Sequence, residues 1–118
     1  MNIEEFREYC LEKKGVTEEL PFDEITLVYK VLGKMFALTN TEGDFSVNLK
    51  CDPEKVIELR EEYPDSVLPG YHMNKKHWNT IMIDGRVSDK LLYTWIDDSY
   101  SLIVEKFTKA MKEKLRLL

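Results

Sequence analysis

The sequence lacks the features that mark several common classes of protein. Only two of its 118 residues, Cys10 and Cys51, are cysteines, and they form neither a CxxC motif nor a disulfide framework. We expect both to be buried thiols. The apolar runs are short, as in Met35–Leu38, and fall far below the length of a membrane span. GxSxG, P-loop, GxGxxG and HExxH motifs are absent and Cys10 has no histidine near it, so we predict no catalytic residue, no cofactor and no enzyme activity.

The composition that remains is typical of one folded domain. Apolar residues make up 43% of the chain and aromatic residues 11%, which excludes disorder by composition. A chain of 118 residues suffices for one hydrophobic core and is too short for two, so we expect a single domain over 1–118. The first residues, Met-Asn-Ile-Glu-Glu, are acidic where a signal peptide is basic and apolar, which favours a cytoplasmic protein.

Charge is unevenly distributed along the chain. The 17 basic and 22 acidic residues give a net charge of −5, and residues 1–24 alone, with eight acidic and three basic residues, carry the same net charge. Affinity for nucleic acid comes largely from neutralising phosphates, so in an acidic protein it must come from a local basic cluster. Two segments offer one: Lys75-Lys76-His77, and the tail that carries Lys106, Lys109, Lys112, Lys114 and Arg116.

Local signals predict a helix, three strands, a helix, two strands and a final helix. Asn2 followed by Glu5, Asp52 followed by Pro53, and Ser88 each mark the start of a helix. The predicted helices cover 3–12, 53–63 and 89 to at least 111, and the predicted strands cover 27–32, 35–39, 45–50, a short piece between 64 and 70, and 79–84. This order predicts an α+β fold of two layers, with an antiparallel sheet of about five strands and helices on one face.

The first hairpin determines which side chains face the open side of this sheet. We expect Gly33-Lys34 to form its two-residue turn. In that register Val31 lies opposite Phe36 and Tyr29 opposite Leu38 on the buried side, while Lys30 lies opposite Ala37 on the open side.

The third strand alternates apolar and polar residues without a fault. Phe45, Val47 and Leu49 should therefore be buried, and the residues between them, Asn48 and Lys50 among them, should face the open side. With Lys30 from the neighbouring hairpin, Asn48 and Lys50 would form a polar, positively charged row. A solvated sheet face without a partner is the alternative that this pattern leaves open.

The segment 71–78 is the densest in chemistry-bearing residues, with two histidines, two lysines and two aromatic residues. Lysines interleaved with aromatic residues suit contacts with phosphates and stacking on bases. In a purely structural interpretation Tyr71 and Trp78 belong partly to the core and the lysines only solubilise the loop. His72 and His77 lie five residues apart with no cysteine nearby, so we expect no metal site.

Several runs carry a resemblance to a known family: Pro21-Phe22, Thr26–Val31, Gly33–Ala37, Val47–Pro53, Pro69–Thr80 and Asp98–Tyr100. In these runs the chain closely resembles the MmcQ/YjbR family. The resemblance implies a YjbR/CyaY-like, secretion-chaperone-like α+β fold, with helices over one face of an antiparallel sheet. It also implies DNA binding through a double-wing arrangement of hairpins. The family's polar motif residues fall on Lys30, Lys34, Asn48, Lys50, Tyr71, His72, Asn74, Lys75, Lys76, His77 and Trp78.

Three functions compete on this basis. We expect weak, salt-sensitive DNA binding through the hairpins and segment 71–78 by a protein that is a monomer and does not enter a membrane. The alternative is a module that binds a small anion or a protein on the open sheet face, with Lys30 and Lys50 holding the anion between walls formed by Tyr71 and Trp78. By analogy with frataxin-like folds, an iron-handling role would use Glu4, Glu5, Glu8 and Glu12.

Overall fold

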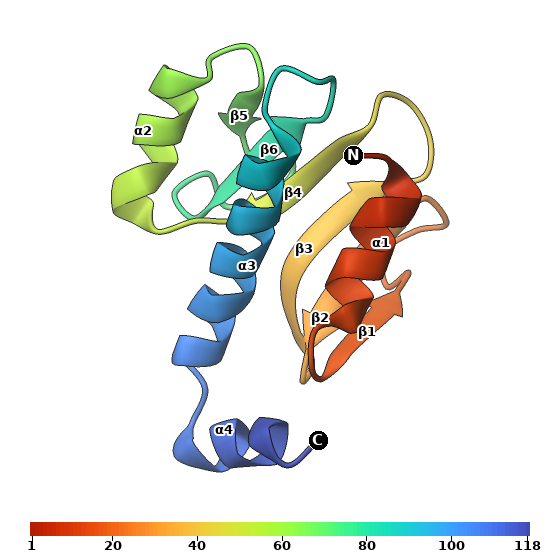
Figure 1. The fold of residues 1–118 in the computed structure, drawn as a ribbon, viewed down its shortest axis with the longest axis vertical. Helices are drawn as coiled ribbons and strands as arrows, with labels where there is room; N and C mark the ends of the chain where they lie inside the picture. Colours follow the sequence, from red (N-terminus) through yellow and green to blue (C-terminus); the bar gives the residue numbers. More distant parts are fainter.

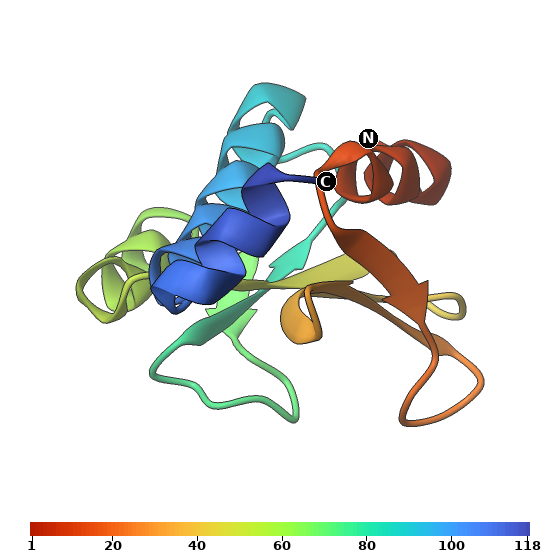
Figure 2. The ribbon, with the colours of Figure 1, turned by 90° about the horizontal axis from the view of Figure 1, so that it is seen from below.

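The computed structural model describes all residues from 1 to 118 and contains four helices and six strands. The strands form one antiparallel sheet in the order β1-β2-β3-β4-β6-β5. The helices lie over one face of this sheet and leave the other face without a helix (Figures 1 and 2). The elements in chain order are α1 (Ile3–Glu12), β1 (Val16–Glu19), β2 (Thr26–Val31), β3 (Lys34–Asn40), β4 (Ser46–Lys50), α2 (Pro53–Glu62), β5 (Val67–Pro69), β6 (Trp78–Met82), α3 (Asp89–Glu105) and α4 (Lys109–Arg116). The predicted α+β class and two-layer arrangement are confirmed.

The predicted helix starts are confirmed, and each has a local cause. In α1 the Asn2 side chain accepts a hydrogen bond from the Glu5 amide at 2.9 Å, and the Glu5 carboxylate accepts one from the Asn2 amide at 3.1 Å. Asp52 caps α2, and Ser88 caps α3 by accepting from the Leu91 amide at 3.2 Å. Such caps satisfy amides that the first helical turn leaves without partners.

The sheet has six strands instead of about five, because the edge strand β1 was not predicted. β1 pairs antiparallel with β2, and Val16 lies opposite Val31. Its sequence, Val-Thr-Glu-Glu, contains one apolar residue, so it lacks the alternation that marks a half-buried strand. Charged residues on an edge strand also discourage pairing with another chain.

The predicted register of the first hairpin is wrong by one residue. Val31 pairs with Lys34, so Leu32-Gly33 forms the turn, with φ of 46° and 84° at its two residues. A two-residue turn with two positive φ values matches the twist of the strands, and glycine adopts its second position without strain. Lys30 lies opposite Met35, and beyond a bulge between Tyr29 and Lys30 the register places Tyr29 opposite Ala37 and Val28 opposite Leu38. Leu38 therefore lies on the open face, because a slip of one residue exchanges the faces of a strand.

The last predicted helix is in fact two helices. α3 ends at Glu105, and the Thr108 hydroxyl then caps α4 by accepting from the Met111 amide at 3.2 Å. The change of direction allows both Phe107 and Leu115 to join the core, where each is less than a tenth exposed. α4 consequently ends beside the turn that joins α1 to β1 (Figure 2).

The main core fills the space between the sheet and the helices. It contains Phe6 and Cys10 of α1, Val47 and Leu49 of β4, and residues of α3, in agreement with the alternation predicted for 45–50. The hydroxyl of Ser99, fully buried in α3, accepts from the Lys50 amide at 2.9 Å and donates to the Phe36 carbonyl at 2.5 Å. None of the helices combines the length and the apolar character that a membrane crossing requires.

Candidate nucleic-acid interface

The loop between β5 and β6, residues 70–77, extends from the sheet on the side opposite the helices (Figure 2). Its base is closed by hydrogen bonds from the Gly70 amide to the Trp78 carbonyl at 3.1 Å and from the Tyr71 amide to the Thr80 hydroxyl at 2.9 Å. A Cβ atom at Gly70 would lie 2.9 Å from the Trp78 carbonyl oxygen, so only glycine permits this approach. Within the loop the Asn74 carbonyl accepts from the His77 and Trp78 amides at 3.2 and 3.0 Å.

Asn74 and Trp78, both predicted site residues, are committed to shaping this loop. The Asn74 side chain accepts from the Lys76 amide at 2.9 Å. Trp78 is only 8% exposed and packs on Val28 and Leu38 in a small cluster on the open face. Met35 of β3 and Met73 of the loop complete the cluster, so Trp78 joins the β2–β3 hairpin to the loop.

Arg60 of α2 holds the loop from the helix side of the sheet. Its guanidinium donates to the side-chain oxygen of Asn79 at 2.7 Å, to the Trp78 carbonyl at 3.2 Å and to the Lys75 carbonyl. The sequence did not reveal this role, because an arginine in an amphipathic helix is most often part of the solvated face.

The exposed part of the loop carries two lysines and an aromatic pair. Tyr71 is 70% exposed, and its ring centroid lies 4.0 Å from that of His72. His72 has a φ of 57°, a left-handed conformation that is uncommon outside glycine. Lys75 and Lys76 are exposed and, like Lys34 in the neighbouring hairpin, take part in no ion pair.

The row predicted from Lys30, Asn48 and Lys50 is not continuous. Lys30 forms an ion pair with Glu19 at 3.3 Å, and Asn48 accepts a hydrogen bond from the Thr80 hydroxyl. Apolar Val28 and Leu38 stand between Glu19 and Asn48 in the cross-strand register. Burial and, secondarily, the charge of Lys106 lower the pKa of half-buried Lys50. These side chains share the sheet but do not make one basic strip.

His77, the remaining predicted site residue, is half-buried at the end of the loop. Its carbonyl accepts from the Cys51 amide at 2.8 Å, which joins the loop to the end of β4. The ring Nδ1 is buried and has no hydrogen-bond partner. His77 therefore presents little of its ring to a large partner, unlike exposed His72.

The opposite flank of the open face is acidic. The loop between β1 and β2, residues 20–25, extends on the same side of the sheet as loop 70–77 (Figure 2). It carries Asp23 and Glu24, and its Phe22 is 64% exposed. The open face therefore carries opposite charges at its two flanks: it is basic at loop 70–77 and the β2–β3 turn, and acidic at the loop between β1 and β2.

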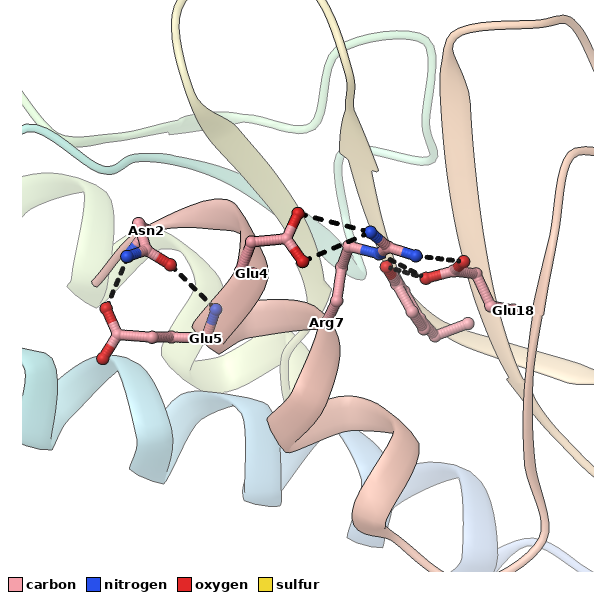
Figure 3. Close-up of polar contacts among 6 residues, drawn as sticks. Asn2, Glu4, Glu5, Arg7 and Glu18 are labelled. Carbon is pink, nitrogen blue, oxygen red and sulfur yellow. Dashed lines mark hydrogen bonds and ion pairs between the residues drawn. The ribbon is translucent and has the colours of Figure 1, made fainter.

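Glu4 and Glu5 of the first helix make contacts within the fold, and Arg7 of the same helix binds Glu18 of β1. Figure 3 shows Arg7 donating to both oxygens of Glu18, at 2.9 and 3.0 Å, and to Glu4 at 3.3 Å. The Tyr29 hydroxyl also donates to Glu18, at 2.8 Å. The hydrogen bond from Arg7 is the main reason that the pKa of Glu18 is lowered. Glu5 belongs to the helix cap, and no group of three or more His, Cys, Asp or Glu side chains is placed to hold a metal ion, so an iron site on α1 lacks a ligand set.

A six-stranded antiparallel sheet with all helices on one face and a basic loop on the other defines a small two-layer α+β domain. Comparison with known proteins identifies the family. The YjbR family model matches residues 11–102, and the chain belongs to this family, which confirms the resemblance seen in the motifs.

The relatives cover nearly the whole chain. The uncharacterized protein YjbR of Escherichia coli (strain K12) is 34% identical over 119 aligned residues, which cover 100% of this chain and 98% of the relative. The uncharacterized protein YbdF of Escherichia coli O157:H7 is 38% identical over 111 residues, which cover 87% of this chain and 90% of the relative. These names establish the family and assign no activity.

Solved structures share the fold. The crystal structure of Deinococcus radiodurans protein DR2400, titled with the domain DUF419, superposes with a TM-score of 0.90 at 44% identity, covering 97% of this chain and 87% of that one. A crystal structure of a Pseudomonas syringae protein gives a TM-score of 0.73 at 28% identity, covering 86% of this chain and 98% of that one. The six-stranded sheet with four helices is thus the architecture of the family.

Proposed function

We propose that this protein binds DNA weakly, through loop 70–77 and the turn of the β2–β3 hairpin. The observation that carries the proposal is the set of exposed lysines without ion-pair partners, Lys34, Lys75 and Lys76, together with the exposed Tyr71–His72 pair. Free ammonium groups are suited to phosphate oxygens, and an exposed aromatic pair is suited to sugars and bases.

The loop and the hairpin turn are held together, so that one partner can contact both. Met35, next to Lys34, packs in the same apolar cluster as Met73 and Trp78. Arg60 anchors the loop carbonyls from the other side. Lysines presented by an anchored loop lose less conformational entropy on binding than lysines on a loose one.

The acidic loop between β1 and β2 limits the DNA contact to loop 70–77 and the β2–β3 turn. Asp23 and Glu24 repel phosphates, so DNA would cross the face at the loop 70–77 end. Three lysines that each neutralise one phosphate give a salt dependence of roughly 40-fold loss of affinity between 50 and 200 mM salt. Lys30, engaged by Glu19, and half-buried Lys50 would contribute only to the surrounding potential.

Fluorescence anisotropy with a labelled duplex tests the proposal. The double variant Lys75→Gln/Lys76→Gln should weaken binding at low salt and reduce its salt dependence. The matched control is Lys109→Gln/Lys112→Gln, which removes the same charge from exposed positions of α4. Absence of binding at tens of micromolar protein, or equal losses in both double variants, would overturn the proposal. Binding of inorganic phosphate without duplex binding would favour the small-anion alternative.

A further inference from the structure

A cavity of about 470 Å³ lies on the helix side of the sheet, between α2 and α3. α2 packs on β5 and β6, whereas α3 packs mainly on β3 and β4, and Figure 1 shows α2 lying beside the upper part of α3. Tyr63, at the end of α2, meets Trp95 of α3 edge to face, with ring centroids 5.5 Å apart. Among the predicted site residues, only Lys50 lines this cavity.

The inner surface of the cavity is apolar. Leu49, Val67 and Ile81 come from three strands, and Leu59 and Leu102 come from the two helices. The volume falls within the range of roughly 300–1,000 Å³ that is usual for small-molecule sites. Leu49, Val67 and Ile81 are each 2% exposed and form a closed floor, whereas Leu59, Leu102 and Trp95 are half-buried. The half-buried side chains leave apolar surface in contact with water, so an apolar ligand group would gain free energy by covering it.

Charged side chains of both signs surround this apolar surface. α3 provides Asp98 and Glu105, α2 provides Lys55 and Glu58, and the end of β4 provides Lys50. None of these five side chains takes part in an ion pair or in a side-chain hydrogen bond with another of them. The sixth charged side chain that lines the cavity, Asp52, caps α2 by accepting a hydrogen bond from the Glu54 amide at 3.0 Å.

Lys50 points to a requirement for an anionic group. It is half-buried and takes part in no ion pair, and Lys106 adds a second positive charge nearby. A partly desolvated ammonium beside another ammonium is unfavourable, and a bound carboxylate would compensate both. Asp98 and Glu105, two turns apart on α3, are exposed and form no ion pair, so both carboxylates are free to accept hydrogen bonds from a ligand.

We propose that the cavity binds a free amino acid with a large apolar side chain. Its carboxylate is held by Lys50 and Lys55, its ammonium by Asp98 and Glu105, and its side chain covers the apolar surface beside Trp95. A rim that offers both signs of charge favours a zwitterion over a simple acid or a simple amine, because only a zwitterion forms charge-assisted hydrogen bonds with both sets of side chains. This site is independent of loop 70–77, which extends from the other face of the sheet.

The test follows the indole resonance of Trp95 in NMR spectra of the ¹⁵N-labelled protein, which has only two tryptophans. L-phenylalanine and L-leucine should shift this resonance saturably, whereas glycine, which has no side chain, should not. 3-Phenylpropanoate, without the ammonium, and 2-phenylethylamine, without the carboxylate, should each bind at least about tenfold more weakly than L-phenylalanine, because each loses charge-assisted hydrogen bonds.

Two variants assign the charged groups. Asp98→Asn/Glu105→Gln should weaken L-phenylalanine but leave 3-phenylpropanoate unchanged, and Lys50→Gln/Lys55→Gln should weaken both. Lys112→Gln on α4 is the surface control, and the dispersion of the backbone resonances reports whether each variant is folded. No saturable shift up to tens of millimolar, equal affinity for all three phenyl compounds, or loss of 3-phenylpropanoate in the α3 variant would overturn the proposal.

Discussion

Arg60 and Asn79 are joined across two layers of the molecule by a hydrogen bond of 2.7 Å from the guanidinium Nε to the amide oxygen. Asn79 is 1% exposed, and its amide nitrogen donates to the Val56 carbonyl at 3.3 Å. The Asn79 side chain therefore links α2 to β6, and Nη2 of Arg60 donates to the Lys75 carbonyl of loop 70–77 and to the Trp78 carbonyl that follows it. The same arginine thus supports the sheet and the candidate interface.

Replacing Arg60 by alanine should lower the free energy of unfolding by about 1–3 kcal/mol, because buried Asn79 loses its charged partner. The loop should also lose its anchor and bind DNA more weakly. Urea denaturation measures the first effect and anisotropy the second. Arg86→Ala, at an arginine whose side chain is 61% exposed, is the control and should change stability by less than about 1 kcal/mol. Equal destabilisation by the two variants would contradict the role of Arg60.

Substitutions at Tyr71 and Trp78 should distinguish a residue needed for DNA binding from one needed for stability. Tyr71→Ala should leave the free energy of unfolding within about 0.5 kcal/mol, because the ring is mostly in solvent, and should weaken DNA binding. Trp78→Ala should cost about 3–5 kcal/mol, because it empties the cluster that includes Val28 and Leu38. Thermal or urea unfolding of both variants checks the contrast. A strongly destabilised Tyr71→Ala variant would show that the ring has a structural role that its exposure does not suggest.

Glu18 should contribute stability that depends on pH. Its pKa is lowered in the folded protein, chiefly by the Arg7 hydrogen bond and also by Tyr29. A lowered folded pKa means that its contribution is complete above the unfolded value, near 4.5, and is lost as the pH falls through the folded value.

Glu18→Gln should therefore reduce stability at pH 7, and the difference from the unmodified protein should shrink as the pH falls below about 4. Urea denaturation from pH 7 to pH 3 measures this. Glu8→Gln is the matched control, because Glu8 is exposed on α1 and forms no ion pair. If the difference in the free energy of unfolding between Glu18→Gln and the unmodified protein grew as the pH fell, the proposed contribution of Glu18 would be contradicted.

The two cysteines should differ in reactivity. Cys10 is fully buried in the core, whereas Cys51 is half-buried beside the α2–α3 cavity. Burial raises the pKa of both thiols, and the thiolate is the reactive form. Mass spectrometry after treatment with a thiol reagent should show slow labelling of Cys51 in the native protein and labelling of Cys10 only after unfolding. Native labelling of a Cys51→Ser variant would contradict the burial of Cys10.

The sequence by itself determined the features that depend on near neighbours. The Asn2–Glu5 cap, the Asp52-Pro53 start and the alternation of 45–50 were all predicted, because a cap or an alternation is complete within a few residues. The family motif was also visible. The exposure of Lys34, Lys75 and Lys76 agreed with prediction, since lysines in turns and loops are seldom buried.

Tertiary structure alone decided how these parts meet. The one-residue slip at Leu32-Gly33 and the bulge at Tyr29/Lys30 moved Leu38 to the open face and broke the expected basic row. The guanidinium of Arg60 donates hydrogen bonds to residues that lie 15 to 19 positions further along the chain. The α2–α3 cavity exists because two helices rest on different strands. Register, long-range hydrogen bonds and cavities depend on contacts between distant segments, whose energies no short stretch of sequence contains.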